Sequence, residues 1–189
     1  MRWIGWRLEK ATWLGFVFWF VVLFAFSTWA FNMESPWTRA LAAGGGVLPE
    51  SQPGFPPGEP AASLAKLGAA RGDYVFWQAL DIPFAIMNLL ATSIAMALAL
   101  KKTRLEATLL RFLLLLPVTY VACELVENTL VALFALGLAP TRGGLVLVQQ
   151  VATTMKFAAG YSSLAFGLLG VFVAAGADAV ALVRRARRP

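Results

Sequence analysis

Four ionisable residues lie inside long apolar segments of the sequence, and they are the first candidates for chemistry. They are Asp81, Glu124, Glu127 and Lys156. A charge in an apolar interior costs free energy, so such groups are usually paired, face a cavity or serve a function. Glu124 and Glu127, which are three positions apart, could share a proton or act as a general acid and a general base. We expect all four side chains to form one buried polar site.

Polar residues recur at steps of three and four in three of the apolar segments, which places them on one face of each helix. Lipid cannot hydrogen-bond to these polar stripes, so we expect the three faces to meet in the interior. Tyr74, Gln78 and Thr92 extend the stripe of the second segment, and Ser163 extends that of the fourth. The candidate site residues are Asp81, Asn88, Tyr120, Glu124, Glu127, Asn128, Gln149, Thr153 and Lys156.

The surplus of three acids over one lysine leaves four interpretations of the site open. One is a structural charge network in which Lys156 pairs with Glu124 or Glu127, while Asn128 and Gln149 complete the hydrogen bonds. The others are a pocket for a lipid or a small hydrophobic or cationic ligand, a carboxylate enzyme acting on a lipid-like substrate, and a proton- or cation-coupled transporter. We favour binding or a structural role over catalysis, because no nucleophile motif or phosphate loop is present.

The numbers of histidine and cysteine residues limit the kinds of site that the chain can form. The chain contains no histidine, which excludes an imidazole ligand for haem or zinc and a histidine base. Its one cysteine, Cys123, excludes an intrachain disulfide and is expected to serve packing. No group of residues has the spacing of a metal site, so the sequence predicts neither a metal nor a cofactor.

Composition places these residues in a membrane protein. Of the 189 residues, 59% are hydrophobic and 14% are charged, and the mean hydropathy is +0.71. Apolar segments over about 11–31, 74–100, 105–138 and 145–183 each approach or exceed the roughly 20 residues that span a bilayer. The sequence therefore predicts an all-α fold, a single four-helix transmembrane bundle of multi-pass topology.

The net charge of +6 comes mainly from bases near the N-terminus, near residues 101–111 and in the C-terminal tail. These places share one side of a four-span protein, so the positive-inside rule predicts that both termini are cytoplasmic. The opposite side is electrically balanced, with Glu50 counted among its loop acids. We interpret the basic residues as a topology signal and an attraction to anionic lipid, not as a nucleic acid surface. Asp81 lies about 30 Å of helix from Lys101, which predicts a site in the outer half of the bilayer.

Residues 32–73 form an outer loop rich in glycine and proline, for which we expect little regular structure. The exception is a short helix over 59–68, with Leu64 and Leu67 resting on the bundle as a lid or a plain connector. Tryptophans near the ends of the first two spans are predicted to be interface anchors, with an aromatic ligand platform as the alternative. Pro117 is expected to kink the third helix and Gly160 to divide the fourth.

Asp81 with Pro83, Glu127 followed by Asn128, and Lys156 resemble the short motifs of an uncharacterised family of small bacterial four-span membrane proteins. The resemblance covers roughly residues 68–166. It implies a multi-pass protein of the bacterial inner membrane and carries no activity with it. The expected partners are the lipid bilayer, a lipid or small hydrophobic or cationic ligand, and a membrane-protein partner or a second copy of the chain.

Overall fold

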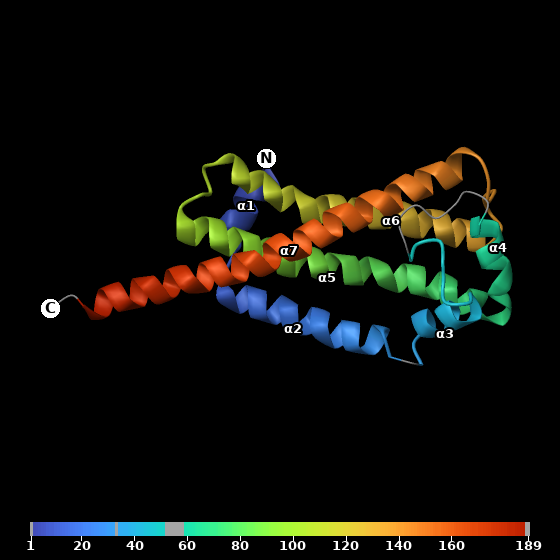
Figure 1. Cartoon of the computed structure of the whole chain (residues 1–189), viewed down its shortest axis with the longest axis horizontal. Coiled ribbons are helices and arrows are strands. Elements are labelled where there is room, and N and C mark those ends of the chain that lie inside the picture. Colours follow the sequence, from blue (N-terminus) through green and yellow to red (C-terminus); the bar gives the residue numbers. More distant parts are fainter. Residues whose placement is uncertain (1, 33, 52–58, 188–189) are drawn as a thin grey trace.

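The computed structural model describes residues 2–32, 34–51 and 59–187. Over these residues the chain is all-helical, without a β-strand (Figure 1). The elements are α1 (Arg2–Lys10), α2 (Trp13–Ala30), α3 (Pro36–Ala43), α4 (Glu59–Lys66), η1 (Gly68–Ala70), α5 (Arg71–Thr103), η2 (Leu109–Leu115), α6 (Leu116–Ala135) and α7 (Gly144–Ala186), where η marks a 3-10 helix. Four helical segments are long and apolar enough to cross a membrane: Trp13–Ala30, Gly68–Thr103, Leu109–Ala135 and Gly144–Ala186.

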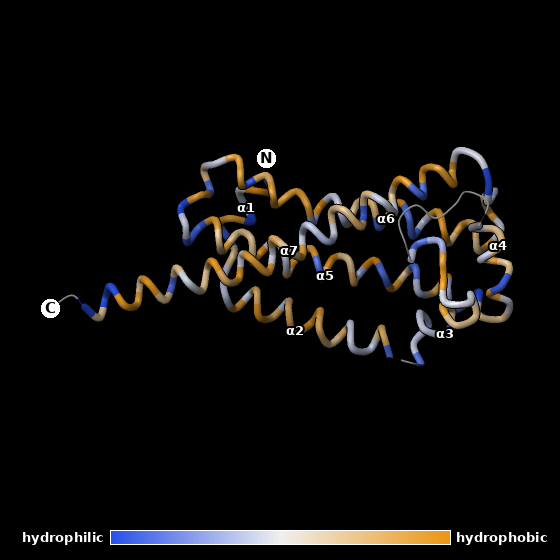
Figure 2. Tube along the Cα trace, viewed as in Figure 1, coloured by the Kyte–Doolittle hydropathy of each residue, from blue (hydrophilic) through white to orange (hydrophobic). Residues whose placement is uncertain are grey.

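Helix α5 forms the centre of the bundle and contacts α2, α6 and α7. Helix α7 crosses α5, while α3 and α4 lie at one end of the bundle, opposite α1 and the C-terminal part of α7 (Figure 1). Hydrophobic residues dominate the long helices, and hydrophilic residues gather near the two ends (Figure 2). This arrangement puts the inward faces of α5, α6 and α7 against one another.

The three polar stripes face the interior, as their spacing predicted. The stripe residues of α5, α6 and α7 that are buried include Gln78, Asp81, Glu124, Glu127, Asn128, Gln149, Thr153, Lys156 and Ser163. Glycines on α7 allow this close packing: a Cβ at Gly170 would lie 2.8 Å from the backbone oxygen of Ala95 on α5. The small residues of α7 therefore serve packing within the chain.

Two expected helix breaks differ from the structure. Helix α7 runs unbroken through Gly160, because a helical glycine costs only about 1 kcal/mol and packing contacts outweigh that. Pro117 does not kink a helix interior but lies in the first turn of α6, directly after η2. A missing N–H costs little in the first turn, where backbone donors lack intrahelical partners anyway.

Helices α1 and α3 were not predicted. In α3, Ser35 caps the N-terminus by accepting a hydrogen bond from the Thr38 N–H, and Pro36 begins the helix. The prediction of little regular structure is therefore wrong for residues 36–43. In α1, Arg7 is buried and donates to Ser93 Oγ at 2.7 Å, so it is not a free surface base.

The short helix of the loop is confirmed as α4, and Leu64 and Leu67 are buried beneath it. Gly68 follows with a positive φ of 50°, a conformation that glycine adopts without strain. The prolines at positions 53, 56 and 57 lie outside the described residues.

Candidate functional site

Lys156 on α7 lies between two carboxylates of α6. Its Nζ is 3.3 Å from Glu124 Oε2 and forms a closer ion pair with Glu127 Oε2. The hydroxyl of Thr153 donates to Glu127 Oε1, and Gln149 Nε2 donates to Thr153 Oγ1 at 2.9 Å. All five side chains are buried. One lysine therefore compensates two carboxylates, instead of the single partner that the sequence predicted.

Asp81 on α5 has an amide as its partner. Asn128 Nδ2 donates to Asp81 Oδ2 at 3.3 Å, and both side chains are buried. Among the residues that the structure describes, no lysine or arginine lies within ion-pair distance of Asp81. Its carboxylate is thus held by α6 without a compensating charge in direct contact.

Glu50 is a fourth buried acid, which the sequence analysis counted among the charges of the outer loop. That assignment is wrong, because the Glu50 side chain enters the bundle and is 4% exposed. Tyr74 donates its hydroxyl to Glu50 Oε2 at 2.5 Å, and Gln78 Nε2 donates to Glu50 Oε1 at 3.1 Å. Burial raises the pKa of the Glu50 carboxyl, although these two hydrogen bonds oppose the rise. The polar stripe of α5 therefore receives an acid from the loop.

Several buried amide oxygens in this interior have no hydrogen-bond donor. The side-chain oxygens of Gln78, Asn128 and Gln149 are buried and have no hydrogen-bond partner. Each of these amides instead uses its nitrogen as a donor. These three oxygens are therefore left without a donor, and buried acceptors without partners are costly.

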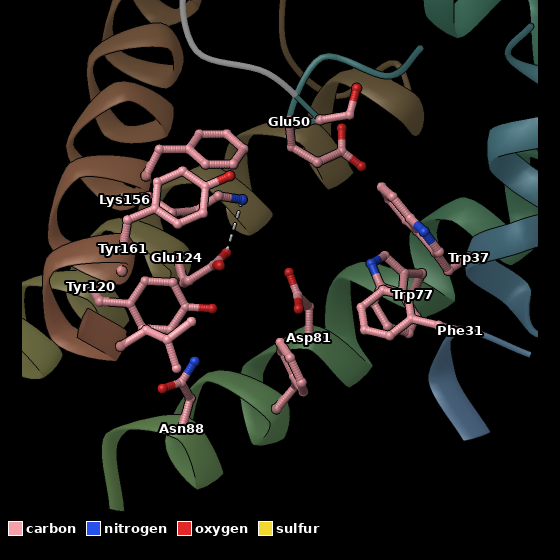
Figure 3. Close-up of a pocket in the computed structure, with 15 residues that line it drawn as sticks. Phe31, Trp37, Glu50, Trp77, Asp81, Asn88, Tyr120, Glu124, Lys156 and Tyr161 are labelled. Atoms are coloured by element: carbon pink, nitrogen blue, oxygen red, sulfur yellow. Dashed lines mark hydrogen bonds and ion pairs between the residues drawn. The ribbon is translucent and has the colours of Figure 1, made fainter. Parts of the chain in front are cut away.

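A cavity of about 350 Å³ opens beside the carboxylates (Figure 3). Glu50, Asp81, Glu124 and Lys156 line its polar side. In Figure 3 the carboxyl groups of Glu50, Asp81 and Glu124 converge on the same space from the loop, α5 and α6. The volume lies within the range of about 300–1,000 Å³ that small-molecule sites occupy.

Aromatic side chains form two walls of this cavity. Phe31, Trp37, Trp77 and Phe84 line one side, where the Trp37 and Trp77 ring centroids are 5.5 Å apart. Across the cavity, Phe157 and Tyr161 of α7 lie with centroids 5.6 Å apart. Trp37 and Trp77, for which the sequence left open an interface anchor or an aromatic platform, thus lie in the cavity wall.

The mouth of the cavity lies between the end of α2 and the side of α7. Phe31 is 53% exposed, Tyr161 is 67% exposed and Leu164 is 48% exposed, and all three line the cavity. A ligand would therefore pass apolar and aromatic groups before it reached the carboxylates. Such an entrance suits a molecule that has both an apolar part and a polar head.

The nine candidate residues divide into two groups around this cavity. Asp81, Asn88, Tyr120, Glu124 and Lys156 line it. The other four do not line the cavity, but they contact the lining residues or one another through the interactions described above. These four are Glu127, Asn128, Gln149 and Thr153. Glu50 and Ser51 also line the cavity, which places the site in the half of the bundle nearest α3.

Several lining residues were not among the nine candidates taken from the sequence. Trp77 could have been found, because it lies four positions before Asp81 on α5 and therefore near the polar stripe. Phe31 and Trp37 come from the flanks of the outer loop, where helical spacing carries no information. Glu50 also gave no signal, because a single acid in a loop looks the same in sequence whether it is buried or solvated.

No group of three His, Cys, Asp or Glu side chains within residues 2–32, 34–51 and 59–187 is placed to hold a metal ion. Comparisons with protein-family models, with curated proteins and with solved structures found no match to this chain. Any assignment of function therefore has to come from the geometry of the site.

Proposed function

We propose that this chain is a four-span integral membrane protein with both termini on the cytoplasmic side, and that it binds an amphiphilic small molecule in the cavity beside Asp81. Four apolar segments of sufficient length support the membrane assignment. The large hydrophobic residues exposed along α2 and α7, such as Leu14, Phe24, Phe172 and Leu182, also support it, because a lipid environment removes the cost of exposing them to water.

The observation that carries the binding proposal is the cavity itself. It combines a polar side containing carboxylates, two aromatic walls and a mouth that opens on the flank of the bundle. In a membrane this mouth would face lipid or the outer headgroup region. An amphiphile could then enter sideways, with its polar head toward Asp81 and its apolar chain along Phe31 and Tyr161.

Binding is favoured over catalysis because the carboxylate pair that suggested acid–base chemistry is already engaged. Both Glu124 and Glu127 form ion pairs with Lys156. This arrangement supports a structural role for the pair, since a buried charge network can specify how helices pack. Asp81 and Glu50 are then the acids that remain for a ligand.

Native mass spectrometry of the protein, extracted from membranes in a mild detergent, tests the binding proposal. We expect the wild-type chain to retain an amphiphile of defined mass, which lipid analysis of the same sample identifies. Leu164→Trp should fill the mouth of the cavity and remove most of this ligand. Leu168→Trp is the matched control, because Leu168 lies one turn further along α7, is 52% exposed and does not line the cavity.

Two outcomes would show that the binding proposal is wrong. One is a wild-type protein that retains no small molecule when purified gently. The other is equal retention by the wild type, Leu164→Trp and Leu168→Trp, which would place any retained lipid outside the cavity.

A further inference from the structure

The chemistry of the ligand head can be inferred from what the cavity lacks. Its lining includes three carboxylates, from Glu50, Asp81 and Glu124, and one lysine. That lysine is already paired with Glu124 and Glu127. Asp81 accepts a hydrogen bond from the Asn128 amide and has no cation in direct contact among the described residues. The site is therefore complementary to a group that is positively charged and rich in N–H donors.

We propose that the polar head of the bound amphiphile is a protonated amine, seated against Asp81 between the two aromatic walls. This inference rests on the proposed binding function and specifies its ligand class. The ammonium group would donate hydrogen bonds to the Asp81 carboxylate, which has no cation in direct contact. Charge-assisted hydrogen bonds of this kind are stronger than those between neutral groups.

The aromatic walls support a cationic head independently of the acids. Trp37 and Trp77 lie on one side of the cavity, and Tyr161 lies on the other (Figure 3). The faces of aromatic rings attract cations, and tryptophan attracts them most strongly. A hydrophobic ligand without a charge would use the same walls but leave Asp81 uncompensated.

Other polar heads fit this lining less well. A phosphate-bearing head would meet repulsion from the carboxylates, because Lys156 is held by two of them. A bare metal ion would lack the clustered ligands it needs, since the described residues contain no such group. A quaternary ammonium head carries the charge but offers no N–H donor, so it could not donate a hydrogen bond to the Asp81 carboxylate.

Three probes with the same alkyl chain separate these contributions: dodecylammonium, dodecyltrimethylammonium and dodecanol. Binding to the purified wild-type protein is measured by native mass spectrometry at pH 7, where alkylamines are protonated. We expect dodecylammonium to bind about tenfold or more tightly than dodecanol, a ratio that one charge-assisted hydrogen bond can provide. Dodecyltrimethylammonium should fall between the two.

A pair of aspartate variants tests whether Asp81 causes the preference for dodecylammonium. Asp81→Asn keeps the size of the side chain and removes its charge, so it should abolish most of the preference for dodecylammonium over dodecanol. Asp73→Asn makes the same change on the same helix at an acid that pairs with Arg39 and does not line the cavity. The Asp73 variant should keep the wild-type preference. If Asp81→Asn does not fold, binding of the three probes to the wild-type protein still decides whether the ligand head is an amine.

The outcomes distinguish this inference from the binding proposal on which it rests. Equal binding of dodecanol and dodecylammonium, blocked by Leu164→Trp, would overturn the amine head and keep the amphiphile site. Equal preference for dodecylammonium in Asp81→Asn and the wild type would also overturn the role of Asp81. Binding of none of the three probes, together with no retained native ligand, would overturn both.

Discussion

The two ends of the bundle handle ion pairs in opposite ways. Near α3, Lys156 has a side chain only 9% exposed and is enclosed with Glu124 and Glu127. At the other end, Lys102 pairs with Asp178 at 2.5 Å, with side chains 37% and 38% exposed. Water shares the solvation of the second pair, so it contributes little to stability. The buried ion pairs of Lys156 are not hydrated in this way, so the surrounding protein groups must compensate each charge.

The two ends of the bundle also differ in how tightly their helices pack. Toward the end with Lys102, the interior contains an apolar cluster that includes Ile94, Leu98, Leu100 and Leu114. There α7 approaches α5 closely at Gly170. Toward α3 the helices instead leave a cavity beside the carboxylates. A tight apolar crossing thus packs the helices together at one end of the bundle, while the other end contains a cavity.

Removing Lys156 should have the largest effect on stability. Lys156→Leu leaves Glu124 and Glu127 buried without their cation, and we expect a loss of about 3–5 kcal/mol in the free energy of unfolding. Lys102→Leu breaks an exposed pair and should cost about 1 kcal/mol or less. Thermal unfolding of both variants in detergent checks this difference. Similar losses in the two variants would contradict the contrast between the ends.

A compensated variant sharpens the same test. Combining Lys156→Leu with Glu124→Gln and Glu127→Gln removes the stranded charges along with the lysine. We expect this triple variant to recover part of the lost stability, because neutral amides cost less to bury than unpaired carboxylates. If it is no more stable than Lys156→Leu alone, lost packing of the lysine stem explains the effect instead.

The next largest effect concerns the close crossing of α7 and α5. Gly170→Ala would place a Cβ 2.8 Å from the Ala95 backbone oxygen, which the helices can accommodate only by moving apart. We expect a destabilisation of about 1–3 kcal/mol. Gly176→Ala on the same helix meets no atom within 4 Å and should be neutral or stabilise by up to about 1 kcal/mol. Equal melting temperatures for both variants would argue against a tight crossing.

The smallest expected effect is a change in pH dependence at Glu50. Its pKa in the folded protein is raised by burial, so the folded state holds this proton more tightly than the unfolded state does. Stability should therefore fall as the pH rises from the ordinary carboxyl pKa of about 4.3 to the raised folded value. Glu50→Gln removes this contribution and should flatten the decrease in melting temperature over that range.

Glu106→Gln is the control for this measurement, because Glu106 is exposed in the connection between α5 and η2. Tyr74, Asp81 and Lys156 also interact with Glu50, so only the difference between the wild-type and variant slopes reports on Glu50. The explanation fails if Glu50→Gln and the wild type lose stability in parallel as the pH rises.

The amino-acid sequence alone determined the helical class, the four apolar segments and which faces of α5, α6 and α7 turn inward. It could do so because helical spacing is local: residues three and four positions apart share a face wherever the helix lies. It also suggested, as one of four interpretations, that Lys156 pairs with Glu124 or Glu127, since these are charges in apolar surroundings. It overlooked α3, where the capping signal of Ser35 and Pro36 was outweighed by the glycine and proline content of the whole segment.

Only the tertiary structure decided which residues surround the cavity. Glu50 reaches Tyr74 and Gln78 across 24 and 28 positions of sequence, and Trp37 meets Trp77 from a different helix. Such contacts depend on how the outer loop folds back over the bundle, which no local spacing encodes. The pairing of Lys156 with an acid of α6 could be predicted from the sequence, whereas the convergence of Glu50, Asp81 and Glu124 on one cavity depends on how the loop and the helices are placed together.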